Sequence, residues 1–285
     1  MLKRLESLYG EIHGLANGVT IRVKKLCWSD PILGGNKYYK LKYNLLRAKE
    51  LGLNHLVTTG GPYSNHLAAT ARAGRLNGFQ TTGIVRGEPV SNITLMRASA
   101  DGMRLVFVSR EQYRKRNDTA FDTDVLGTVR DWYFIPEGGS NEDGIRGCSE
   151  ILEEQDQQFS HVAVCCGTGT TALGLLKALP MHQHLLCFSV MKGNSDLNSL
   201  LGQSEKVTVV HDYHFGGYAK SDMALDQFCA RFGHEHGIQI EPVYTGKMFF
   251  GLLQMISNGQ IKAGSSVLAL HTGGLQYLQT DAVVG

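Results

Sequence analysis

A lysine at the start of a helical segment is the first residue whose position could serve chemistry. Gly34-Gly35-Asn36-Lys37 leads into the helical pattern YYKLKYNLLRAKELG. A cation in a first helical turn lies at the unfavourable end of the helix dipole, and the same field lowers the pKa of the amine. Because a neutral amine is a nucleophile, Lys37 is a candidate to attack a carbonyl carbon. The alternative is an exposed basic face that Lys37 shares with Lys40, Lys42 and Arg47.

Two glycine-rich turns could hold an anion. Each follows an apolar run and precedes a helical segment: GGPYSNH at 60–66 and CGTGTT at 166–171. Backbone N–H groups at a helix start, helped by short polar side chains, bind phosphate or carboxylate. In the first turn, Ser64 and Asn65 are alternatively ordinary N-caps. The second turn lacks the Gly-Lys-Ser/Thr of a Walker A loop and the G-x-G-x-x-G of a dinucleotide site, which leaves a phosphate site of another kind.

Two further polar turns are expected at strand ends. They are PVYTGK at 242–247 and HTGG at 271–274. Their alternative interpretation is structural, as turns with threonine caps and a half-buried tyrosine.

The elements that position these turns alternate along the chain. Apolar, β-rich runs at 55–61, 81–87, 104–109, 161–169, 185–190, 206–213 and 265–274 are separated by segments with helical periodicity. Apolar runs without alternation indicate strands buried on both faces, and therefore a parallel α/β fold. In such sheets ligands bind beyond the carboxyl ends of the strands. The most polar segment, 110–131, is expected to form a charged surface helix and loop.

Composition narrows the classes of function. The chain has 285 residues, of which 42% are hydrophobic and 19% charged, and its net charge is +2. This balance gives no support for nucleic-acid or membrane-surface binding. The N-terminus has no apolar leader and no stretch is long enough for a membrane helix, so a cytoplasmic protein is expected. None of the six cysteines forms a C-x-x-C pair, which predicts no disulfides, and the paired histidines lack a third metal ligand.

Taken together, the turns resemble those of the tryptophan synthase β-like (fold type II) pyridoxal 5'-phosphate (PLP) enzymes. Within that class the chain is similar to the group that contains 1-aminocyclopropane-1-carboxylate (ACC) deaminase and D-cysteine desulfhydrase. The ordered motifs GGNKxxKL, GGxxSNH, CGTGTT, PVYTGK and HTGG carry the resemblance between Gly34 and Gly274. It implies two α/β domains with open, parallel-rich twisted sheets and helices on both faces. We expect a large PLP-binding domain at 1–40 and 135–285, and a smaller inserted domain at 41–134.

The resemblance also implies residue roles. Lys37 binds PLP covalently, Ser64 lies near the substrate carboxylate, and Tyr218 and Tyr244 contact the substrate and move protons. The other implied cofactor contacts are Lys40 at the cofactor's edge, Asn65 at the phenolic oxygen, Gly167, Thr168, Gly169 and Thr170 at the phosphate, and Thr245 and Thr272 at the ring nitrogen.

Two threonines separate this chain from the ACC deaminases of the group, which carry Glu at the position of Thr245 and Leu at that of Thr272. A carboxylate makes the ring a strong electron sink, whereas a hydroxyl supplies no compensating charge. The weaker sink suffices for β-elimination of a thiolate. The segment 24–30, KKLCWSD, also replaces a Lys-Arg-Glu-Asp segment, a difference that concerns the substrate pocket.

The expected function is therefore a D-cysteine desulfhydrase-like β-elimination that converts a small amino acid into a keto acid, ammonia and sulfide. The resemblance further implies a homodimer. The alternatives are ACC deaminase, a lyase for D-serine or another small amino acid, a catalytically silent PLP carrier, and an α/β protein that binds a different phosphorylated ligand.

Overall fold

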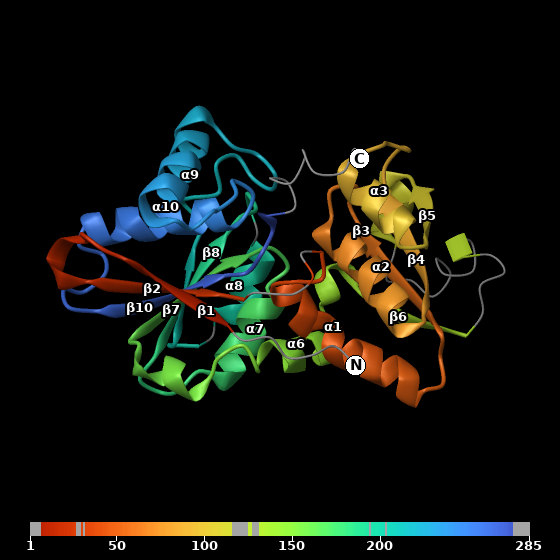
Figure 1. Ribbon diagram of the computed structural model, residues 1–285, viewed down its shortest axis with the longest axis horizontal. Helices are drawn as coiled ribbons and strands as arrows, with labels where there is room; N and C mark the ends of the chain where they lie inside the picture. Colours follow the sequence, from red (N-terminus) through yellow and green to blue (C-terminus); the bar gives the residue numbers. More distant parts are fainter. Residues whose placement is uncertain are drawn as a thin grey trace.

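Two sheets occupy the two halves of the computed structural model, which describes residues 7–26, 30, 32–115, 125–126, 131–193, 195–202 and 204–275 (Figure 1). The larger sheet has the strand order β1-β2-β10-β7-β8-β9 and the smaller sheet the order β5-β4-β3-β6. All paired strands are parallel except β1 and β2. This topology confirms the predicted parallel-rich α/β fold.

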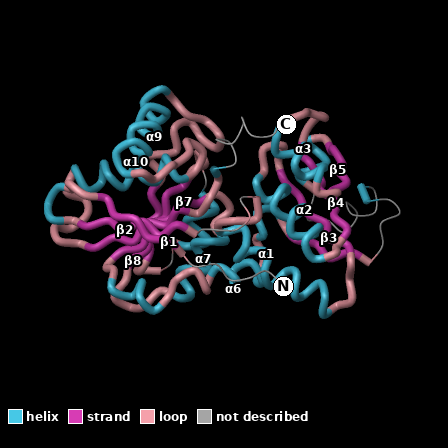
Figure 2. Tube along the Cα trace, viewed as in Figure 1, coloured by secondary structure: helices cyan, strands magenta, loops and turns pink. Residues whose placement is uncertain are grey.

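The six-stranded sheet is covered on both faces. Its strands are β1 (Leu8–Ile12), β2 (Thr20–Lys25), β7 (His161–Cys166), β8 (His184–Ser189), β9 (Val207–Val210) and β10 (Ser266–His271). Helices α9 (Met223–His236) and α10 (Thr245–Ser257) lie on one side, and α7 (Thr170–Ala178) lies on the other (Figures 1 and 2). Within β7, Ala163 packs with the α9/α10 core, whereas Val162 and Val164 pack with the α7 core. Burial on both faces explains why the sequence of β7 does not alternate.

The four-stranded sheet is built from one continuous part of the chain. Its strands are β3 (His55–Gly60), β4 (Gln80–Arg86), β5 (Met103–Val108) and β6 (Trp132–Ile135), and its helices include α2 (Asn65–Asn77), α3 (Ile93–Ala100) and α4 (Arg110–Arg114). Leu56 and Val57 of β3 belong to separate core clusters on opposite faces. Helix α4 confirms the expected polar helix, while the remainder of that segment lies mostly outside the described residues.

Helix α1 (Asn36–Glu50) belongs to both halves. Tyr38 and Tyr39 pack with the core of the large sheet, whereas Leu41 and Leu45 pack with the core of the small sheet. The same helix lies against α6 (Glu142–Cys148), which returns the chain to the large sheet. Lys37 thus lies on α1, the helix that joins the two halves of the molecule. The expected domain boundaries at 40/41 and 134/135 stay a prediction.

The expected strand end before Pro242 is wrong. Residues 238–240 form no strand, and α10 begins after a turn at 242–244. Ile238 and Ile240 are nevertheless buried in the core under α9 and α10, so their apolar character reflects loop packing and not sheet pairing. Strands β1, β2 and β6 and helices α6 and α8 (Ser195–Leu201) complete the fold without having been predicted.

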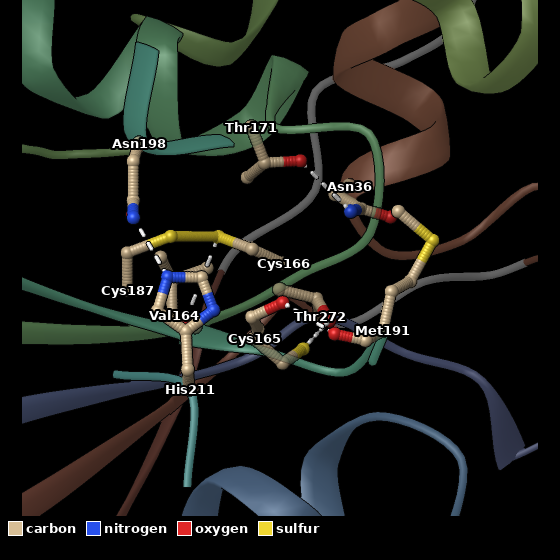
Figure 3. Close-up of a disulfide and its surroundings, with 11 residues drawn as sticks. Asn36, Val164, Cys165, Cys166, Thr171, Cys187, Met191, Asn198, His211 and Thr272 are labelled. Carbon is tan, nitrogen blue, oxygen red and sulfur yellow. Dashed lines mark hydrogen bonds between the residues drawn. A yellow bond between two sulfur atoms is a disulfide. The ribbon is translucent and has the colours of Figure 1, made fainter. Parts of the chain in front are cut away.

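A disulfide joins Cys166 to Cys187, contrary to the prediction (Figure 3). The two residues are 21 positions apart in sequence, but they lie on the neighbouring strands β7 and β8 with a Cα–Cα distance of 6.1 Å, a separation that suits a disulfide. The prediction failed because it examined local spacing, whereas the partners meet only through strand pairing. Within the described part of the chain, no helix is long and apolar enough to cross a membrane.

Candidate active site

The turn that carries Lys37 is tied to the end of β10. The Asn36 backbone N–H donates to the Thr272 carbonyl oxygen at 3.2 Å. Gly35 precedes the helix with φ 76° and ψ −155°, a region that essentially only glycine adopts. A Cβ atom at Gly35 would overlap the Thr272 carbonyl oxygen. Close backbone approach therefore brings the start of α1 to the HTGG turn.

Asn36 connects Lys37 with the threonine-rich loop. The Lys37 Nζ atom donates to Asn36 Oδ1 at 2.7 Å. Asn36 Nδ2 in turn donates to Thr171 Oγ1 at 2.9 Å (Figure 3). The amine thus points toward the loop after β7 and not away from it, which excludes an exposed basic face for Lys37. Asn36 received no role in the sequence interpretation, although it lies within the motif GGNK.

Burial sets the electrostatics of the lysine pair. Burial, together with the nearby positive charge of Lys40, lowers the pKa of Lys37 to about 7. Burial also lowers the pKa of Lys40, whose side chain is only 6% exposed. The predicted direction for Lys37 is confirmed, but its main cause is loss of solvation and not the helix dipole. Close to half of the Lys37 amine is neutral at pH 7.

We expect reductive methylation of Lys37 in the cofactor-free protein to reach half of its maximal rate near pH 7. An ordinary lysine, with a pKa near 10.5, is neutral in only about one molecule in three thousand at that pH. Reductive methylation over a pH series, followed by peptide mass spectrometry, measures the labelling of each lysine. A midpoint above pH 9 for Lys37 would contradict the burial argument.

The start of α2 provides an unpartnered buried acceptor. Asn65 is 6% exposed, and its Oδ1 atom has no hydrogen-bond partner among the residues that the structure describes. Ser64 occupies the N-cap position but makes no capping hydrogen bond through its side chain, so the ordinary capping interpretation of this turn is wrong. A buried amide oxygen without a partner is costly unless a ligand satisfies it.

His66 places this turn beside the lysines. Burial, together with the charges of Lys40 and Lys37, lowers the pKa of His66 to about 3. A Cβ on Gly139 would lie 3.1 Å from Lys40 Cβ and 3.5 Å from His66 Cε1. The starts of α1 and α2 therefore meet at Gly139, and His66 is a neutral side chain between them. The sequence interpretation gave His66 no role.

The CGTGTT loop has the form of an anion cradle. Gly169 has φ 86° immediately before α7, and the Thr168 and Thr170 hydroxyl oxygens lie 3.0 Å apart. A Cβ on Gly167 would lie 3.5 Å from the Tyr244 ring. The backbone therefore passes close to Tyr244, and the first N–H groups of α7 and two hydroxyls converge at one helix start.

The two predicted tyrosines are neighbours. The rings of Tyr218 and Tyr244 lie 5.7 Å apart in an edge-to-face arrangement. Burial raises the pKa of both hydroxyls, and that of Tyr244 stands well above its ordinary value. The charges of Arg86 and Glu137, from the small-sheet half, also act on Tyr218. Both phenols are protonated at neutral pH and can donate protons.

A buried carboxylate is the main feature that sequence reasoning missed. Glu241 is fully buried, and it accepts the backbone N–H groups of Val243, Tyr244 and Thr245. The Thr245 hydroxyl donates to the same carboxylate at 3.1 Å. Burial raises the pKa of Glu241 to about 7, against the effect of these donors. Its only sequence signal was an acidic residue directly before Pro242.

Thr272 is the last predicted site residue, and it too has a protein partner. Its hydroxyl lies 3.2 Å from the Cys165 sulfur (Figure 3). Glu241 affects the pKa of Lys37 and of Cys165, so the carboxylate lies within electrostatic range of both the lysine and the β7 end. The predicted residues therefore gather where β7, β10 and the starts of α1, α2, α7 and α10 meet.

These features fit PLP. A neutral lysine amine matches an aldehyde, and a helix-start cradle matches a phosphate ester. The Asn65 Oδ1 atom can accept a hydrogen bond from a phenolic O–H group. The pyridoxal-phosphate dependent enzyme family model matches residues 11–273, so the chain belongs to that family.

Similar proteins indicate which group within this family the chain resembles most. A Thermotoga maritima protein provisionally named 1-aminocyclopropane-1-carboxylate deaminase is 32% identical and covers 96% of this chain and 92% of its own. The mitochondrial bifunctional D-cysteine desulfhydrase/1-aminocyclopropane-1-carboxylate deaminase of Arabidopsis thaliana is 28% identical over 92% of this chain and 74% of its own.

Solved structures agree on the fold. The crystal structure of an ACC deaminase homologue has a TM-score of 0.78 at 26% identity and covers 95% of this chain and 90% of that one. The O-acetylserine dependent cystathionine β-synthase of Helicobacter pylori has a TM-score of 0.69 at 14% identity, covering 94% and 92%. The protein thus has the tryptophan synthase β-like fold and is a PLP-dependent enzyme of the deaminase and desulfhydrase group.

Proposed function

We propose that the protein eliminates the β-substituent of a small amino acid, as a D-cysteine desulfhydrase does, and releases a keto acid, ammonia and sulfide. The observation that carries this proposal is the buried Lys37 amine, joined through Asn36 to the threonine-rich loop. Lys37 would bind the cofactor covalently, Gly167 to Thr170 would hold its phosphate, and Asn65 would contact its phenolic oxygen. PLP supplies an electron sink for the charge that develops at Cα.

The protein's own groups can move the required protons. Once the substrate amine has displaced it, the Lys37 amine is a base with a pKa near neutral and can accept the Cα proton. Ser64, free of a capping role, can bind the substrate carboxylate. Tyr218 and Tyr244 keep their protons at neutral pH and can protonate the leaving sulfur. This set of donors argues against a catalytically silent carrier.

ACC deaminase is the second candidate, and Glu241 favours it. The carboxylate expected at position 245 in ACC deaminases is absent, but Glu241, which is partly ionised at neutral pH, brings a buried carboxyl group to the same turn through the Thr245 hydroxyl. The charge of its ionised form strengthens the electron sink that opening a cyclopropane ring demands. Thr245 and Thr272, which supply no charge of their own, support the elimination as the main activity.

We also propose the assembly and location that accompany this function. The protein is a homodimer of the cytoplasm, with domains at 1–40 and 135–285 and at 41–134, and substrate binding closes one domain on the other. The position of α1 in both hydrophobic cores supports a hinge near its start.

A substrate panel tests the activity. We expect D-cysteine to yield pyruvate, sulfide and ammonia in equal amounts, and ACC to yield less 2-oxobutyrate. L-cysteine and D-serine, incubated under the same conditions, report stereochemistry and leaving group. The Lys37→Ala variant is the control for cofactor-independent chemistry. Turnover of ACC alone would reverse the order of the two candidates, and no turnover of any amino acid by the PLP-loaded protein would favour a silent carrier.

A further inference from the structure

Tyr218 lies in a loop with an unusual backbone. Phe215, Gly216, Gly217 and Ala219 all have positive φ, at 51°, 85°, 120° and 55°. Glycine adopts such angles freely, but Phe215 and Ala219 do so at an energetic cost. The loop therefore needs interactions from outside to keep this conformation.

Lys247 supplies two of these interactions. Its side chain is 1% exposed, and its Nζ atom donates to the carbonyl oxygens of His214 at 2.9 Å and Gly217 at 2.7 Å. The same carbonyls accept backbone N–H groups within the loop, from Gly217 and Lys220 respectively. One ammonium group thus joins the two consecutive hydrogen-bonded turns, 214–217 and 217–220, that contain the positive-φ residues.

The placement of Lys247 has no evident benefit for α10 itself. It lies in the first turn of the helix, where the dipole disfavours a cation, and it is buried. Burial lowers its pKa to about 8, and the charge of Glu241 opposes that effect. Lys247 therefore remains mostly a cation at neutral pH, and two carbonyl oxygens accept its hydrogen bonds.

The same helical turn presents Tyr244 to the site. Tyr244 precedes Lys247 by three residues, so both side chains leave one face of the helix start. Tyr244 contacts the Tyr218 ring, and Phe215 packs edge-to-face on Phe250 of α10 at 5.1 Å. The loop is consequently fixed to α10 by aromatic packing and by the Lys247 ammonium group.

We propose that Lys247 is a positioning residue that holds the 214–220 loop, and with it the Tyr218 hydroxyl, against Tyr244. The proposal deepens the proposed function, because it rests on Tyr218 acting on the substrate. Lys247 itself touches neither substrate nor cofactor in this role. Its effect on turnover should pass entirely through Tyr218.

Hydrogen exchange of the PLP-loaded protein tests the structural part without any assay of activity. In Lys247→Met, the amides of Gly217 and Lys220 should exchange at least about tenfold faster, while those of β7 and β10 keep their protection. Lys206→Met is the matched control, because the Lys206 ammonium group also donates to a backbone carbonyl, that of Leu179 at 3.2 Å. Unchanged exchange in the loop of Lys247→Met would overturn the proposal, whatever the enzyme's substrate proves to be.

A double-mutant cycle on kcat tests the functional part. Lys247→Met and Tyr218→Phe should each lower kcat by about tenfold or more, and the double variant should be no slower than Tyr218→Phe alone. Effects that multiply would show that Lys247 acts by another route, which would overturn the proposal. If Lys247→Met does not fold, Gly217→Ala disturbs the same loop while it keeps the Lys247 side chain, and it should give the same exchange and kinetic pattern. If the wild-type protein showed no activity on any of these amino acids, the proposed function would be refuted. The hydrogen-exchange result would still decide the role of Lys247.

Discussion

Replacing Lys37 by alanine should abolish both the covalent attachment of PLP and turnover. In the proposed function this amine forms the bond to the cofactor and then accepts the Cα proton, so its loss should remove two steps at once. We expect turnover to fall by at least about 10³-fold. Absorbance near the visible edge and mass spectrometry after borohydride reduction report the covalent bond, and pyruvate formation reports turnover.

The control for this variant lies on the same helix. Lys49→Ala removes an exposed lysine near the end of α1, and both readouts should match those of wild type. If Lys37→Ala kept the visible absorbance and its turnover, another amine would hold the cofactor and Lys37 would lose its assigned role.

Gly35→Ala should be among the most damaging glycine substitutions in the chain. A left-handed backbone disfavours alanine, and the new Cβ would also overlap the Thr272 carbonyl oxygen that receives the Asn36 N–H. The two effects together should lower the free energy of unfolding by about 3 kcal/mol or more. Because the turn also orients Lys37, PLP affinity should fall as well. Urea unfolding of the cofactor-free protein and PLP titration measure the two effects.

Gly52→Ala is a control that introduces backbone strain without the atomic overlap expected at Gly35. Gly52 has φ 69°, but a Cβ there meets no atom within 4 Å. We therefore expect a loss of only about 1 kcal/mol and no change in PLP affinity. Equal destabilisation in the two variants would show that the contact with Thr272 adds nothing to the cost at Gly35.

The sequence predicted those parts of the fold that depend on residues close together in the chain. The helix starts at Lys37 and Asn65 followed from glycine-rich turns before helical periodicity, and β7 and β10 followed from apolar runs. These signals can be read from short stretches of sequence, because backbone angles and side-chain periodicity are set by residues close together in the chain. The apolar residues at 238–240 were misassigned because burial in a loop and burial in a sheet require the same side chains.

Contacts between distant segments could not be predicted in the same way. The sequence placed Lys37 in a first helical turn and predicted a lowered pKa, but the dominant cause proved to be burial at the meeting point of several elements. Its link through Asn36 to Thr171 spans 135 positions. The Cys166–Cys187 disulfide likewise required neighbouring strands.

By itself, the sequence determined the ordered set of turns, the class of fold and the lysine that the cofactor requires, because each depends on residues adjacent in the chain. Only the tertiary structure decided the electrostatics of the site. The pKa of Lys37, the buried charge of Glu241 and the pairing of Tyr218 with Tyr244 depend on distance in space and on exclusion of water. Both arise when separate segments pack together, and no spacing along the chain encodes them.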